Sequence, residues 1–281
     1  MAARPRRKFA DIPPGSQDPL SYAVSQRDGS VMDIVRDAIA HRQAMLAFQP
    51  VMRASNPEKV AFYEGLIRVM DPTGRVIPAG EFMGQAEPTE LGREIDVVAL
   101  RMGLQALRAN PGLRLSINMS ARSIGYSDWQ NTLMRHIKRD PTVGERLILE
   151  ITESSAMMVP ELVVGAMDDY QPHGVCFALD NYGAGQTAIR YFKDFFFDIL
   201  KIDGQFVRGI AQNPDNRIIT AALISIAGHF DMLTVAESVE RAEDAELLTR
   251  MGVDCLQGYF YAAPTVSPGW KTAREAAAKR A

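Results

Sequence analysis

Six polar residues each follow directly after a short, largely apolar run of the chain. They are Asn118, Glu150, Asp180, Lys201, Glu237 and Gln257. Burying a carboxylate or an ammonium group at the end of an apolar strand is costly unless the charge is paired or binds a metal. A helix N-cap or a satisfied core hydrogen bond explains any one of them taken alone. Their recurrence after successive runs indicates a shared site.

The residue types in this set favour hard cations. Carboxylates that gather at one place need positive charge, and the oxygen atoms of Asp, Glu and Asn suit Mg²⁺, Mn²⁺ or Ca²⁺. None of the six is a cysteine or a histidine, which argues against a tetrahedral zinc site. For Lys201, the alternative to a catalytic role is an ordinary ion pair with Asp203 or Glu150.

The elements that must position these residues alternate between strands and helices. Apolar runs cover residues 113–120, 146–153, 175–181, 197–203, 232–240 and 253–261, with earlier candidates at 46–51 and 60–68. Helical patterns between them imply βαβ units and a parallel sheet. The count approaches the eight strands of a closed (β/α)₈ barrel, in which all strand carboxyl ends open onto the face where active sites lie. An open doubly wound sheet is the alternative, but the Gly-rich phosphate loop that often accompanies it is missing.

Composition sets the broad class of the protein. The 281 residues are 47% hydrophobic and 23% charged, with a formal net charge of −3 and two cysteines. This is typical of a globular protein in a reducing compartment, so we expect a cytoplasmic location. A mildly acidic body argues against a binder of nucleic-acid polymers. No apolar run approaches the roughly 20 residues of a transmembrane segment.

The ends of the chain differ from its middle. Residues 1–30 are predicted to form a flexible, basic arm, with ordered structure beginning near Asp33, an N-cap candidate. Residues 31–268 are predicted to form one domain, and residues 269–281, rich in Ala, Lys, Arg and Glu, a helical tail.

Together with a further carboxylate, Glu64, the motifs resemble those of the EAL-domain family of cyclic-di-GMP phosphodiesterases. The resemblance covers about residues 35–265. It rests on Gln49-Pro50, Glu64-Gly65-Leu66-Ile67-Arg68, Asn118-Met119-Ser120, Glu150-Ile151-Thr152-Glu153, Asp180-Asn181-Tyr182-Gly183, Leu200-Lys201-Ile202-Asp203, Ala236-Glu237-Ser238-Val239-Glu240 and Gln257-Gly258-Tyr259. Each motif is weak by itself, but the eight occur in the family's order.

The resemblance implies a (β/α)₈, TIM-like barrel with an irregular first strand. It also implies metal-dependent hydrolysis of cyclic-di-GMP to linear pGpG, with two Mg²⁺ or Mn²⁺ ions. By this similarity the first ion is held by Glu64, Asn118, Glu150 and Asp180. Glu237 completes the second site beside Asn181, with Asp180 shared between the two ions.

Other residues take supporting roles by the same similarity. Lys201 contacts the attacking water and helps to deprotonate or orient it, which requires a pKa lowered by burial and neighbouring cations. Gln257 lies near that water or the substrate. Gln49, Leu66 and Arg68 line the substrate groove, Arg68 near a phosphate. Glu153 braces the loop after Asp180.

The chain departs from the family at Asn181, where hydrolytic members usually carry a second aspartate. The lost charge predicts a weaker second metal. The following loop, residues 183–187, also differs, and in the family it often contributes to a homodimer contact. Ser238 replaces a common glycine.

Three functions are compatible with these departures: a slow phosphodiesterase, a cyclic-di-GMP receptor and a protein-interaction module. The retained site residues argue against the third. An input signal is expected from a partner protein or from the nucleotide itself.

Overall fold

The fold was described from a computed structural model, which places residues 19–183 and 193–270. The strands are β1 (Ala44–Arg53), β2 (Asn56–Met70), β3 (Val76–Pro78), β4 (Leu115–Asn118), β5 (Leu147–Thr152), β6 (Cys176–Tyr182), β7 (Ile199–Ile202), β8 (Leu233–Ala236) and β9 (Cys255–Leu256). The sheet order is β1-β9-β8-β7-β6-β5-β4-β2-β3, and β1 also pairs with β2. Eight strands therefore close into a barrel, and β3 extends β2 outside it. The predicted barrel is confirmed, and the open sheet is excluded.

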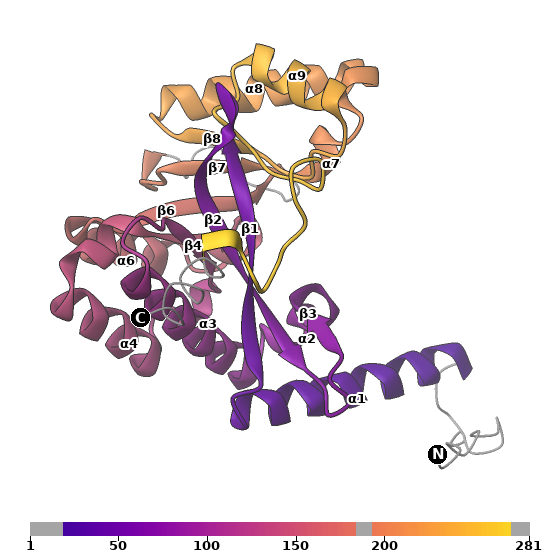
Figure 1. The fold of residues 1–281 in the computed structure, drawn as a ribbon, viewed down its shortest axis with the longest axis vertical. Coiled ribbons are helices and arrows are strands. Elements are labelled where there is room, and N and C mark those ends of the chain that lie inside the picture. The colour runs from indigo at the N-terminus through magenta and orange to yellow at the C-terminus, as the bar shows by residue number, and fades with distance from the viewer. Residues whose placement is uncertain (1–18, 184–192, 271–281) are drawn as a thin grey trace, which may run out of the picture.

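The start of the barrel is irregular, as the family resemblance implied. β1 runs antiparallel to both of its neighbours, β2 and β9. From β2 through β9 the remaining barrel neighbours are parallel. The long β1–β2 ribbon crosses the whole molecule in Figure 1. Its register places Gln49 opposite Glu64, which brings these two polar side chains to the same mouth of the barrel as the parallel strand ends.

Helices cover the outside of the strands. They are α1 (Pro19–Ala40), α2 (Met83–Ala86), α3 (Glu90–Ala109), α4 (Ser127–Arg139), α5 (Glu153–Met158), α6 (Pro160–Tyr170), α7 (Gly204–Val207), α8 (Pro214–His229) and α9 (Ala242–Met251). Short 3₁₀ turns cover Ala79–Glu81, Ala121–Ser123, Pro141–Arg146, Gln171–His173 and Ile210–Gln212. Because the parallel strands are enclosed on both faces, their residues are nearly all apolar and buried, as in Leu147, Leu149 and Ile151 of β5.

The first helix begins earlier than the sequence predicted. Irregular structure was expected up to about residue 30, but α1 is helical from Pro19. Gly29 and Ser30 in its middle have low helix propensity and hid the pattern. Val35 and Ala38 are buried in the core and anchor the later turns, from which a helix extends at little cost per residue.

The ends of the chain leave part of the domain prediction untested. The basic residues between Arg4 and Lys8, and residues 271–281 of the predicted helical tail, lie outside the described residues. Among residues 19–183 and 193–270, no helix has the length and apolar character that crossing a membrane requires.

Candidate active site

The predicted site residues that lie at strand ends all meet at one mouth of the barrel. Asn118 ends β4 and lies opposite Glu150 of β5, while Asp180 lies near the end of β6. Lys201 lies on β7. Glu237 and Gln257 directly follow β8 and β9. A parallel sheet points all these strand ends in the same direction, so residues spread over much of the sequence meet in space.

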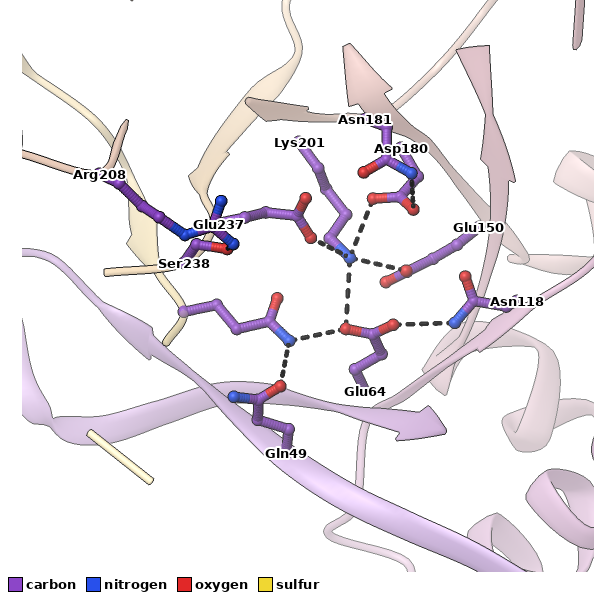
Figure 2. A network of polar contacts seen from close by, with 11 residues as sticks. Gln49, Glu64, Asn118, Glu150, Asp180, Asn181, Lys201, Arg208, Glu237 and Ser238 are labelled. Carbon is purple, nitrogen blue, oxygen red and sulfur yellow. Dashed lines mark hydrogen bonds and ion pairs between the residues drawn. The ribbon is translucent and has the colours of Figure 1, made fainter. Parts of the chain in front are cut away.

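Lys201 lies at the centre of this cluster, as Figure 2 shows. Its side chain is buried, and its Nζ lies within ion-pair distance of four carboxylates. The distances are 2.8 Å to Glu150 Oε2, 2.9 Å to Glu237 Oε1, 3.2 Å to Asp180 Oδ1 and 3.3 Å to Glu64 Oε2. The pairing with Glu150 that the sequence offered as an alternative therefore exists, as one of four. Asp203 instead caps α7 by accepting a bond from the backbone N–H of Gln205.

Amide side chains fix Glu64 from the other side. Asn118 Nδ2 donates to Glu64 Oε1 at 2.8 Å, and Gln257 Nε2 donates to Glu64 Oε2 at 2.6 Å. Gln257 Nε2 also donates to Gln49 Oε1 at 3.2 Å, and Gln49 Nε2 donates to the carbonyl of Ala262 at 3.1 Å. This chain of bonds holds both Glu64 oxygens in fixed directions (Figure 2).

The cluster sets the protonation of its two best-paired groups. Burial works to lower the pKa of Lys201, but the four surrounding carboxylates outweigh it and raise the pKa well above its usual value. The lowered pKa that the resemblance implies for Lys201 depends on neighbouring cations, so it stays a prediction for the cluster with metal bound. Burial likewise works to raise the pKa of Glu64, but Lys201 and the donors Gln257 and Asn118 lower it below the ordinary value.

Two other carboxyl groups of the cluster have a pKa that is raised, in contrast to that of Glu64. Burial, together with the charges of Glu64 and Asp180, raises the pKa of Glu150 to about 8. Burial and Asp180 raise the pKa of Glu237 well above its ordinary value. One ammonium does not offset four carboxylates, so the cluster retains protons at neutral pH that a cation would replace.

The donor set fits a hard divalent cation. Glu150 Oε1, Asp180 Oδ1 and Gln257 Oε1 are buried and accept no hydrogen bond, although Asp180 Oδ1 is near the lysine. These are oxygen atoms of the type that Mg²⁺ and Mn²⁺ prefer. Within the described part of the chain, no three acidic, cysteine or histidine side chains form a ready set of metal ligands. The carboxylates surround Nζ instead, so an entering cation competes with the Lys201 ammonium.

The segment after Asp180 has an unusual backbone. Asn181 has a φ of +56°, the left-handed region that asparagine tolerates better than most residues. Its Nδ2 donates to Asp180 Oδ2 at 3.2 Å. The N–H of Gly183 donates to Glu153 Oε2 at 2.8 Å, which is the contact that the bracing role of Glu153 requires. The rest of the variant loop lies outside the described residues.

Two cavities flank the carboxylate cluster. One, of about 230 Å³, is lined by Gln49, Leu66 and Gln257, and the other, of about 370 Å³, is lined by Leu66 and Asn118 among others. Arg68 is half-buried, and its Nη1 donates to the carbonyl of Ile67 at 2.9 Å. It is not among the residues that line either cavity, so its predicted phosphate contact remains a prediction.

Sequence reasoning missed Asp96, a buried carboxyl in α3. Asp96 Oδ2 accepts bonds from the backbone N–H of Ser120 at 2.9 Å and from Ser123 Oγ at 2.6 Å. Burial raises its pKa to about 7. These bonds fix the loop that follows Asn118. The available signal was an acidic residue between Ile95 and Val97, in a stretch that the sequence did not identify as a helix and that forms α3.

Comparisons with known proteins agree with this geometry. A family model described as the EAL domain matches residues 32–264. The signaling protein YkoW of Bacillus subtilis is 30% identical over 82% of this chain and 29% of its own length. The bifunctional diguanylate cyclase/cyclic di-GMP phosphodiesterase MucR of Pseudomonas aeruginosa is 28% identical over 86% of this chain and 36% of its own length. The chain thus spans about a third of these curated relatives.

A solved structure gives the same match in three dimensions. The structure titled "PaMucR Phosphodiesterase, c-di-GMP complex" is 27% identical, with a TM-score of 0.76. The match covers 86% of this chain and 99% of that one. The similarity therefore extends over a complete barrel with its site.

Proposed function

The chain belongs to the EAL-domain family, and from this premise we propose that it hydrolyses cyclic-di-GMP to linear pGpG with the help of divalent metal ions. One observation carries the proposal. Four carboxylates, each on or directly after a different strand, converge on one buried lysine, within 3.3 Å of its Nζ, at the mouth of the barrel. A protein that only needed stability gains little from such a buried charge cluster.

The proposed metal ligands are the ones that the family pattern implies. Glu64, Asn118, Glu150 and Asp180 would hold one ion, and Glu237 and Asn181, with Asp180 shared, would hold the second. Bound divalent ions lower the pKa of water and neutralise charge on phosphoryl oxygens during in-line displacement. The choice between Mg²⁺ and Mn²⁺, two ions per site and a weaker second ion are parts of this proposal.

The chain's own residues supply position and proton donors. Lys201, whose Nζ lies within 3.3 Å of an oxygen of each of the four carboxylates, would contact and orient the attacking water. Gln257 shares its amide between Glu64 and Gln49, so it links the carboxylate cluster to the substrate groove. Leu66 and Arg68 would complete that groove, and Glu153 would hold the loop after Asp180.

The direct test is incubation of the purified protein with cyclic-di-GMP and Mg²⁺ or Mn²⁺. Formation of pGpG is followed by chromatography, and nucleotide binding is measured in parallel. Product that appears with metal and disappears with EDTA is the expected result. Absence of both binding and turnover would contradict the proposal and leave a protein-interaction module.

A cyclic-di-GMP receptor is the second candidate, and Asn181 favours it. Its amide nitrogen, a hydrogen-bond donor, faces Asp180 Oδ2 at 3.2 Å. A neutral amide in that orientation adds no negative charge for a second cation. Tight nucleotide binding without product would select this function.

Replacing Asn181 with aspartate is expected to tighten the second metal site and to raise turnover. The added carboxylate restores one charge, which we expect to change metal affinity by about tenfold or more. Turnover is measured against Mn²⁺ concentration for both proteins. Equal metal dependence in the two would contradict this account of Asn181, and Asn181→Ala is the matched control for loss of the amide.

Metal affinity is expected to rise with pH. The pKa of Glu150 is raised to about 8, so below that pH a metal must displace a proton from the folded protein. Affinity for Mn²⁺ should increase about tenfold per pH unit for each proton released, and the contribution of Glu150 should level off above about pH 8. Calorimetry in buffers of different ionisation enthalpy counts the protons. Binding that does not change with pH would mean that Glu150 is already ionised.

The setting of the reaction is also a proposal. We place the protein in the cytoplasm, where its nucleotide would be found. We also propose that it forms a homodimer and that a signalling partner protein regulates it. The loop proposed for the dimer contact covers residues 183–187, and all of it after Gly183 lies outside the described residues. Light scattering of the full chain tests the dimer.

A further inference from the structure

The cavity of about 230 Å³ beside Glu237 has a strongly acidic wall. Glu64, Glu237 and Glu240 all line it, together with Gln257 and the exposed ring of Tyr259. Of the residues that the structure describes around this cavity, Arg208 alone carries a positive charge. Lys201 is buried and surrounded by carboxylates, so Arg208 is the cation that a ligand entering this cavity can reach.

Ser238, next to Glu237, fixes the guanidinium of Arg208. The Nη2 of Arg208 donates to Ser238 Oγ at 2.9 Å (Figure 2). Ser238 has a φ of +56°, a backbone conformation that favours glycine. A serine in this backbone conformation is strained, and its hydroxyl makes a hydrogen bond to Arg208 that a glycine could not make. The serine that departs from the family's common glycine therefore has a structural consequence.

Gly204, the first residue of α7, makes room for this arrangement. A Cβ atom at position 204 would lie 2.5 Å from Ser238 Oγ and 3.3 Å from Arg208 Cζ. Only a glycine lets α7 approach Ser238 this closely. The ends of β7 and β8, which carry Lys201 and Glu237, are thus joined by the contact that sets the direction of Arg208.

Arg208 retains capacity to bind a ligand. Its Nε donates to Glu240 Oε1 at 3.3 Å, but both side chains are more than half exposed, so the pair is weak. Within residues 19–183 and 193–270, Nη1 donates to no partner. A guanidinium in this state offers donors in the planar geometry that matches a phosphate group.

We propose that Arg208, positioned by Ser238, binds a phosphate group of the nucleotide substrate in this cavity. The inference rests on the proposed function, because it takes cyclic-di-GMP as the ligand. The dinucleotide carries two anionic phosphodiesters into a cavity walled by carboxylates. A reachable cation there offsets the repulsion and gives direction to the bound phosphate.

The test compares cyclic-di-GMP binding by four variants with the wild type, by calorimetry in EDTA, and KM and kcat with Mn²⁺. Arg208→Gln should weaken binding about tenfold or more and raise KM far more than it lowers kcat. Arg208→Lys should stay within about threefold of the wild type, since an ammonium still binds phosphate as a point charge. Ser238→Gly should weaken binding by about threefold, because Arg208 remains but is no longer held.

Arg241→Gln is the matched control. Arg241 is an exposed arginine that pairs with Glu243 at 3.3 Å, and it should bind as the wild type does. Thermal unfolding of each variant checks that it is folded.

Several results would overturn the inference. Wild-type affinity and KM in Arg208→Gln would show that Arg208 makes no substrate contact. An Arg208→Lys variant as weak as Arg208→Gln would show that a positive charge alone at this position does not support binding, which would contradict the charge contact to a phosphate. Unchanged binding in Ser238→Gly would show that Ser238 does not position Arg208 for the ligand. A wild-type protein that neither binds nor cleaves cyclic-di-GMP would instead refute the proposed function itself.

Discussion

Replacing Glu64 with alanine is expected to abolish hydrolysis and divalent-ion binding together. Both Glu64 oxygens are held, by Asn118 Nδ2 on one side and by Gln257 Nε2 and Lys201 on the other. These partners lower the pKa of Glu64, so its ionised form is favoured over the protonated form. If Glu64 is a metal ligand as proposed, its loss from a site that supplies several kcal/mol of charge stabilisation should reduce turnover by at least about a thousandfold.

The measurement is pGpG formation together with Mn²⁺ binding by calorimetry. Glu64→Gln keeps the size of the side chain and one carbonyl acceptor, so it separates loss of charge from loss of packing. Glu246→Ala removes an exposed carboxylate on α9 and should change neither quantity. Hydrolysis that persists in Glu64→Ala would place the catalytic site elsewhere.

Replacing Lys201 with methionine is expected to destabilise the protein and make its stability depend on divalent ions. The change leaves four carboxylates, previously within 3.3 Å of one ammonium, without that charge. Removing one partner from a buried charge cluster costs about 3–5 kcal/mol. For a domain of this size, that corresponds to a Tm lower by about 10 °C. Turnover should fall as well, because this variant lacks the group that we propose orients the attacking water.

Divalent ions provide the discriminating measurement. An entering cation no longer competes with the ammonium, so Mn²⁺ should raise the Tm of Lys201→Met by more than it raises that of the wild type. Lys138→Met makes the same chemical change on an exposed residue of α4 and is the control. A Tm shift by Mn²⁺ that is equal in wild type and variant would mean that lysine and metal do not share the carboxylates.

Most of the barrel could be predicted from local patterns. Parallel strands enclosed on both faces must be apolar, and β5, β6 and β7 are visible as apolar runs for that reason. The polar residues that break those runs at their ends marked the site in advance. The beginning of α1 was not predictable in this way, because Gly29 and Ser30 weaken the local signal and distant packing of Val35 and Ala38 supports the helix.

The sequence by itself indicated the barrel and the set of residues at its mouth, because strand burial and side-chain chemistry are local properties. The family followed from the resemblance of its ordered motifs. The tertiary structure alone decided the direction in which the pKa of Lys201 and of Glu150 shifts, since a pKa depends on distances to charges contributed by other strands. It also decided the place of Arg208, which meets Ser238 across thirty positions of sequence, through a contact that Gly204 permits. Charge and approach distance act through space, and the fold sets both.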